Sequence, residues 1–249
     1  MAETTPGIQL NQLSKSFDGN INVIDHLELE IPAGKFVAVL GPTGCGKTTM
    51  LRMIGGLESP DEGTITFTKS DPQIAFCFQE PRLLPWRNVA SNIRLPLEIE
   101  GIPDAGPRVD KVLDLVGLAP AATRMPAALS GGMKMRTSLA RALVSKPNLL
   151  LLDEPFGALD EVTRYRLDED VAKLIRNRHT TTLLVTHSIT EAVFLADEVV
   201  VLSSAPASIV DRFPIEFDER IPKLRIDPEF SKMTARIYEA LRSGMEDTA

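Results

Sequence analysis

The chain has 249 residues, 43% of them hydrophobic and 24% charged, which is enough for one large or two small folded domains with a substantial core. The formal net charge of -7 argues against nucleic acid as a partner, because binding through overall charge requires a basic protein. No run of roughly 18 apolar residues occurs, and the N-terminus has neither a basic nor an apolar leader region. We therefore expect no segment to cross a membrane, and any membrane role to require a partner.

Strand patterns dominate the beginning of the chain. Residues 8–17 read as a strand, and residues 27–31 alternate apolar and acidic side chains, which is typical of a strand with one wet face. We expect these two strands to be antiparallel. After a turn at 32–34, the continuous apolar run 36–40 predicts a central strand buried on both faces.

The segment GPTGCGKTT, residues 41–49, lies between that strand and a helical pattern starting at Met50. It matches G-x-x-x-x-G-K-[ST], in which backbone N–H groups cradle phosphates while lysine and hydroxyl reach phosphate and magnesium. Glycines allow positive φ and close approach, and the helix N-terminus attracts anions. The loop predicts a site for a nucleoside triphosphate, formed by Gly41, Pro42, Thr43, Gly44, Cys45, Gly46, Lys47, Thr48 and Thr49.

The two cysteines, Cys45 and Cys77, have no metal-ligand spacing. We interpret both as reduced thiols of a cytosolic protein. Cys45 is either a passive loop residue or an oxidation-sensitive one.

The middle of the chain predicts short strands at 64–67 and 74–78 after a turn at 59–63, and then a change of pattern. From 88 to 145, helical spacing and proline breaks indicate a helical insertion. Strands at 149–152, 181–185 and 199–202 alternate with helical patterns, which predicts a mainly parallel sheet. Asp227 followed by Pro228 predicts the start of a helix over about 228–243, with a frayed tail at 244–249.

Four leucines at 149–152 place Asp153 and Glu154 at the carboxyl edge of a buried strand, where ligands bind in open parallel sheets. Asp153 is a candidate magnesium ligand and Glu154 a candidate base for an attacking water. The segment LSGGM, 129–133, opens a helix and forms a second possible anion-binding terminus.

The order GPTGCGKT, Gln79, LSGGM, LLLLDEP, ALD and His187 resembles the ATP-binding-cassette (ABC) ATPases over nearly the whole chain. FQEPRLLPW, LSGGMKMRTSLARAL and DEPFGALDEVTR are most similar to ATPase subunits of nitrate, sulfonate and taurine importers. The resemblance implies one α/β domain, with a P-loop ATPase core and an antiparallel β subdomain (6–87 and 146–217), a helical subdomain (88–145) and the C-terminal helix.

The resemblance also implies roles for matching residues. Phe17 would stack on adenine, and Gln79 would sense magnesium and water and link the site to membrane subunits. From the residues alone, Phe17 and His187 could instead belong to the core, and Asp160 could cap a helix. The implied catalytic residues are Lys47, Gln79, Glu154 and His187, the magnesium ligands are Thr48, Gln79 and Asp153, and the residues completing the ATP site are Ser130, Gly131, Gly132 and Asp160.

In this family the signature closes on the ATP of a second copy, so the implied unit is a dimer. The usual LSGGQ ends here in Met133, which puts the tuning of turnover in question. The implied partners are transmembrane permease subunits, contacted through 79–86, and a solute-binding protein. These place the chain on the cytoplasmic face of the membrane.

Two further alternatives stay open. Trp86, the only tryptophan, is either a docking residue or a core residue. The rival function is a soluble ABC ATPase without transport, such as a cofactor-assembly scaffold.

Overall fold

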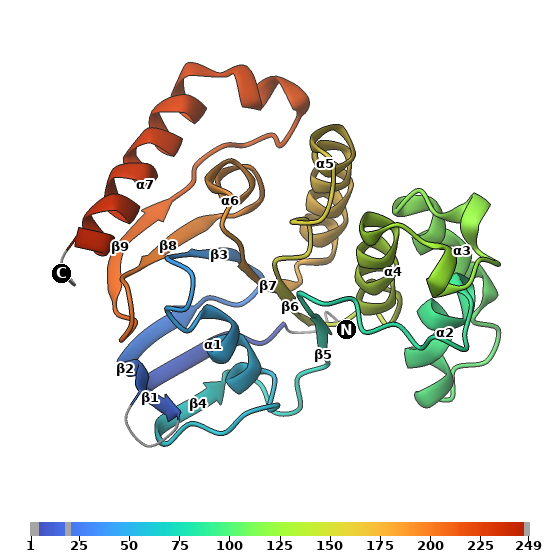
Figure 1. Cartoon of the computed structure of the whole chain (residues 1–249), viewed down its shortest axis with the longest axis horizontal. Coiled ribbons are helices and arrows are strands. Elements are labelled where there is room, and N and C mark those ends of the chain that lie inside the picture. Colours follow the sequence, from blue (N-terminus) through green and yellow to red (C-terminus); the bar gives the residue numbers. More distant parts are fainter. Residues whose placement is uncertain (1–4, 18–20, 247–249) are drawn as a thin grey trace.

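The computed structural model describes residues 5–17 and 21–246, which form two sheets surrounded by helices (Figure 1). The smaller sheet is antiparallel, as predicted for the first two strands. Its strand order is β2 (Ile21–Ile31), β1 (Ile8–Phe17) and β4 (Glu62–Phe67). The larger sheet has the order β5 (Ile74–Cys77), β6 (Leu149–Asp153), β7 (Thr181–Val185), β3 (Phe36–Leu40), β8 (Glu198–Leu202) and β9 (Ile209–Pro214).

The larger sheet is parallel from β5 to β8, and only β9 pairs antiparallel. The α/β class with a mainly parallel sheet is thus confirmed, although strand β9 was not predicted. Successive side chains of β3 point to opposite faces, and all five are buried. Val37 and Val39 pack in the core between the larger and the smaller sheet. Phe36, Ala38 and Leu40 pack in a second core on the opposite face of the larger sheet.

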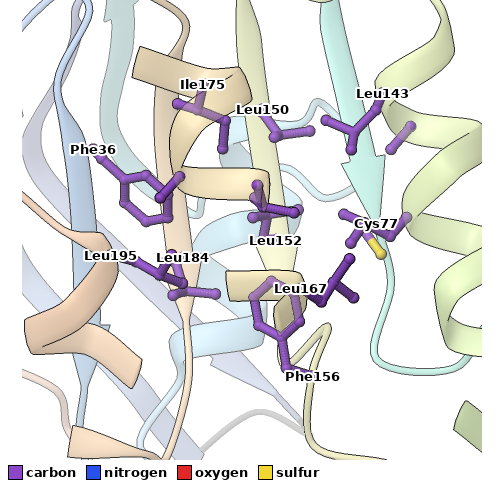
Figure 2. Close-up of a cluster of buried hydrophobic side chains, with 14 of the residues drawn as sticks. Phe36, Cys77, Leu143, Leu150, Leu152, Phe156, Leu167, Ile175, Leu184 and Leu195 are labelled. Carbon is purple, nitrogen blue, oxygen red and sulfur yellow. The ribbon is translucent and has the colours of Figure 1, made fainter. Parts of the chain in front are cut away.

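Helix α1 (Lys47–Ile54) lies on the side of the smaller sheet, and α5 (Glu161–Arg178) and α6 (Ile189–Leu195) lie on the other face (Figure 1). Figure 2 shows Leu150 and Leu152 of β6 and Leu184 of β7 in one cluster with side chains of α5 and α6. Helix α1 begins at Lys47, three residues before the predicted helical pattern, because left-handed Gly46 caps it.

The segment predicted to be helical carries α2 (Val89–Ile99), α3 (Gly106–Leu115) and α4 (Gly131–Val144), which gather at one end of the molecule (Figure 1). The Cys77 thiol of β5 lies 3.7 Å from the Ser138 hydroxyl of α4, and Leu143 of α4 belongs to the same core, which joins this end to the sheet (Figure 2). Short 3-10 turns at Ala119–Ala121 and Pro126–Ala128 connect α3 to α4. The division into subdomains stays a prediction.

The chain ends in a 3-10 turn, Pro222–Ile226, and helix α7 (Pro228–Glu246). The Asp227 carboxylate accepts a hydrogen bond from the Glu229 N–H at 2.8 Å, which confirms the predicted cap. The helix runs three residues beyond the predicted end at about 243: Gly244 is buried, and a Cβ there would lie 2.7 Å from Val210 Cγ2, so this last turn packs on β9. Of the predicted frayed tail, 247–249 lie outside the described residues.

Within the described ranges, no helix has the length and apolar character needed to span a membrane.

Candidate active site

Three parallel strands end at one edge of the larger sheet. Val39 of β3 pairs with Val185 of β7, and Val185 pairs with Asp153 of β6. The loops that follow these strands therefore start side by side. This register brings the phosphate-binding loop, the acidic pair and the segment around His187 to the same edge, as the sequence predicted.

The phosphate-binding loop depends on glycine at two positions. Gly44 has φ +83°, and Gly46 has φ +102°. A Cβ on Gly46 would also lie 2.8 Å from Val23 Cγ1, which is closer than real contacts allow. The loop therefore turns directly into the N-terminus of α1, where unpaired N–H groups favour an anion.

Lys47 is buried, yet its ammonium stays at the loop. Nζ donates hydrogen bonds to the carbonyl oxygens of Gly41 at 2.8 Å and Pro42 at 2.7 Å. The full positive charge is thus held across the loop by backbone acceptors. Cys45 is buried beneath it, and burial raises the pKa of its thiol, which favours the passive role for that residue.

The candidate magnesium ligands Thr48 and Asp153 are in contact. The Thr48 hydroxyl donates to Asp153 Oδ1 at 2.9 Å. Burial raises the pKa of Asp153, and the hydrogen bond from Thr48 opposes that rise. A hydroxyl and a carboxylate at one point, with a phosphate-binding loop beside them, are oxygen donors of the kind that Mg²⁺ prefers, so these residues fit the ion.

Glu154 is held in an unusual backbone conformation with φ +47°, which costs about 1–3 kcal/mol for a residue other than glycine. Its N–H donates to the Val185 carbonyl at 2.8 Å, which fixes the turn. The Gln79 amide donates to Glu154 Oε2 at 3.3 Å, and His187 Nδ1 lies 3.3 Å from the same oxygen. Three residues predicted as catalytic, from three separate loops, therefore meet at one carboxylate oxygen.

His187 is not a core histidine, because 63% of its side chain is exposed.

The loop that carries His187 contains residues that the sequence analysis missed. The Thr186 hydroxyl accepts from the Ser188 N–H at 3.0 Å, and the Ser188 hydroxyl caps α6 by accepting from the Glu191 N–H at 3.3 Å. Glu191 is 3% exposed, and burial raises its pKa to about 8, with a contribution from nearby Asp168. The THSITE segment carries a cap signal, but no pattern predicts a buried carboxyl there.

The signature residues lie at the start of α4. Ser130 caps that helix, its hydroxyl accepting from the Met133 N–H at 3.3 Å. Gly132 lies against the loop of Leu159, since a Cβ there would be 3.0 Å from Leu159 Cδ2. Asp160 caps α5: its carboxylate accepts a hydrogen bond from the Thr163 N–H at 3.0 Å, which confirms that Asp160 is a helix cap. Ser130, Gly131 and Asp160 are exposed, and within the described chain no side-chain hydrogen bond joins Ser130 or Asp160 to residues 41–49.

Phe17 is 39% exposed at the end of β1, so it does not belong to the core. The ammonium of Lys15 lies 5.4 Å from the centre of its ring. The ring is available for stacking, which stays a prediction.

Trp86 is 71% exposed, so its core alternative was wrong. The segment that carries Trp86 is fixed by hydrogen bonds from two residues, Asn92 and Arg141, whose role no sequence pattern predicted. Buried Asn92 accepts from the Leu84 N–H at 2.8 Å and donates to the Arg87 carbonyl at 2.8 Å. Arg141 of α4 donates to the carbonyl of Pro81 at 2.9 Å. An exposed tryptophan thus stands on a fixed loop.

The chain is similar to known proteins over most of its length. The profile of the ABC transporter family matches residues 24–157. The chain is 42% identical over 244 residues to the aliphatic sulfonates import ATP-binding protein SsuB of Rhodopseudomonas palustris, covering 97% of this chain and 85% of the relative. It is 43% identical over 236 residues to SsuB 1 of Streptomyces avermitilis, covering 94% and 86%. A solved dimeric structure of a post-hydrolysis state of the ATP-binding cassette MJ0796, bound to ADP and Pi, superposes with a TM-score of 0.77 at 28% identity, covering 84% of this chain and 99% of that chain.

The parallel sheet, the phosphate-binding loop and the acidic edge define a P-loop ATPase. The chain belongs to the ABC transporter family, as the motif order predicted. The predicted resemblance to importer ATPases is also confirmed, because the relatives are import ATP-binding proteins and not members of the soluble, non-transport class. The roles of individual site residues stay predictions.

Proposed function

We propose that the chain binds ATP with Mg²⁺, hydrolyses it as a dimer, and so drives import of a small oxyanion or sulfonate. The observation that carries this proposal is the meeting of Gln79, Glu154 and His187 at one carboxylate oxygen, beside the Thr48–Asp153 pair. The names of the relatives support an aliphatic sulfonate over nitrate as the solute class.

In this mechanism the chain supplies position and charge. Lys47 and the N-terminus of α1 hold the terminal phosphates, which concentrates positive charge where negative charge develops. Glu154 accepts a proton from the attacking water, whose orientation is fixed by the Gln79 amide, and His187 contacts the γ-phosphate. Bound Mg²⁺, held by Thr48, Asp153 and Gln79, would neutralise phosphate charge.

A second copy completes the site. Ser130, Gly131 and Asp160 are exposed, and an exposed helix N-terminus is suited to an anion brought by another molecule. The similar cassette MJ0796 is a dimer in its post-hydrolysis state. Each copy would therefore supply half of two sites.

The exposed Trp86 and the fixed loop 79–86 support docking to the permease subunits at the cytoplasmic face of the membrane. Because this loop starts at Gln79, docking and catalysis would be coupled through one residue. A solute-binding protein would complete the transporter and select the solute.

Replacing Glu154 with Gln tests the hydrolysis step. The amide keeps the shape but cannot take a proton, so we expect hydrolysis to fall about 100-fold or more while ATP affinity is kept. Exposed Glu219→Gln is the matched control and should hydrolyse normally. Hydrolysis that survives in Glu154→Gln would remove Glu154 from this role.

The same variant tests the dimer, because ATP that is bound but not hydrolysed should hold two copies together. Light scattering at micromolar protein should show a dimer only when ATP is present. A monomer under these conditions contradicts the shared site.

The transport role is tested by purifying the chain from gently solubilised membranes. Permease and solute-binding proteins should copurify, and sulfonates should stimulate hydrolysis by the complex. Recovery in soluble fractions without these proteins would favour the non-transport alternative.

A further inference from the structure

A cavity of about 550 Å³ lies at the opposite edge of the sheet from the active site. It is lined by Lys146 and Asn148, just before β6, whereas Asp153 ends that strand. The five residues of β6 separate the two edges by roughly 16 Å. The cavity is therefore distinct from the nucleotide site.

Four cationic side chains line this cavity, and they come from three parts of the chain. Arg108 and Lys111 belong to α3, Lys146 to the connection before β6, and Arg178 to the end of α5. Among residues 5–17 and 21–246, none of the four makes an ion pair or a side-chain hydrogen bond.

The two arginines repel each other. Burial lowers the pKa of Arg178, and the positive charge of Arg108 lowers it further. Asp114 and Asp170 line an adjoining hollow of about 330 Å³ together with Lys111 and Arg178, but neither forms an ion pair with them. Like charges gathered in a half-buried place cost free energy, and within the described ranges none of the four cations forms an ion pair that would reduce this cost.

Helix ends explain only part of this arrangement. Arg178 lies in the last turn of α5, where the helix dipole favours a cation. Arg108 lies in the first turn of α3, where the dipole disfavours one, and that turn has no acidic residue. Arg108 therefore has no role in helix stability that would account for its place.

The rest of the cavity wall is apolar. Val112 of α3, Val144 of α4 and Pro147 are buried residues that line it. A ligand that suits both parts has an anionic group for the cations and an apolar body for this wall. Guanidinium pairs match tetrahedral oxyanions through paired N–H donors.

We propose that this cavity binds a small organic anion with a phosphate or sulfonate group on an apolar body. Such a ligand would bridge α3 to the end of α5 and the start of β6. The net charge of -7 and the confined, partly apolar cavity favour a small molecule over nucleic acid.

The test titrates pentyl phosphate and pentanesulfonate, separately, into the full chain by isothermal calorimetry, with pentanol as the uncharged probe. The double variant Arg108→Gln with Arg178→Gln should bind the anions at least about tenfold more weakly, since charged hydrogen bonds are lost. The matched control, exposed Arg94→Gln with exposed Lys173→Gln, removes the same charge elsewhere and should bind as the original chain does. The phosphate-binding loop is intact in the original chain, the double variant and the control, so anion binding at that loop is common to all three proteins.

The tighter anion identifies the preferred group, and weaker binding of either anion by the double variant than by the matched control supports the site. Equal affinity for the anions in all three proteins overturns the proposal. A result in which the double variant binds only an oligonucleotide more weakly, and the anions unchanged, overturns it as well. Without ligand, the double variant should melt no lower than the original chain, because repulsion has been removed. If it fails to fold, exposed Lys111→Gln with exposed Lys146→Gln decides, and unchanged anion affinity in that pair overturns the proposal.

Discussion

The buried carboxyl of Glu191 makes the stability of the fold depend on pH. Burial raises the pKa of Glu191 to about 8 from an ordinary value of 4.5, and nearby Asp168 adds to the rise. Below pH 4.5 the carboxyl is protonated in both folded and unfolded chains, and its favourable contribution is fully present. As pH rises toward 8, only the unfolded chain loses the proton, so the free energy of unfolding falls by up to about 1.4 kcal/mol per pH unit.

Replacing Glu191 with Gln removes this loss while keeping the shape of the side chain. The variant should gain stability over the original chain as pH rises from 5 to 8, by at least about 1 and at most about 5 kcal/mol at the upper end. Asp168, with its pKa raised to about 7, leaves a smaller slope of the same sign in the variant.

Urea unfolding at several pH values measures this difference, with exposed Glu219→Gln as the control that should follow the original chain. Parallel stability curves for Glu191→Gln and the original chain between pH 5 and 8 would refute the reasoning, because the carboxyl would then ionise alike in both states.

Three further substitutions probe separate parts of the site. Gly46→Ala should lose about 1–3 kcal/mol of stability and weaken binding of a fluorescent ATP analogue, because of its φ of +102° and the contact with Val23; unchanged binding would contradict the loop geometry. Ser130→Ala should lower ATPase activity and cost about 1 kcal/mol as a lost cap, with Ser130→Thr as the control that keeps the hydroxyl; full activity would contradict a role in the shared site. Trp86→Ala should leave unfolding within about 0.5 kcal/mol and weaken pull-down of the permease; a large loss of stability would restore the core interpretation.

The sequence predicted the elements whose signal is local. The apolar runs before residues 41 and 153 identified buried parallel strands, and the motifs at their ends located the active-site edge. Strand β9 was missed because only Phe213 of its six residues is buried, which leaves no alternating pattern. A sheet edge has few partners, so its sequence carries little information.

The finer parts of the site depend on contacts between distant segments. Nothing near Glu154 predicts φ +47°, since that turn is fixed by the Val185 carbonyl on another strand. Asn92 and Arg141 look like ordinary polar positions on helices until the loop before α2 is seen to depend on them. The four cations of the second cavity are likewise brought together only by the fold.

The polarity of the parallel sheet explains why the two anion sites are built differently. Helices α1, α5 and α6 all begin at the carboxyl edge, where their N-termini add positive potential, so one lysine in the loop is enough to complete a phosphate site. Helix α5 ends at the amino edge, and its C-terminus adds negative potential there. The proposed anion site at that edge lies beside this C-terminus, and it depends on full positive charges from side chains that line the cavity.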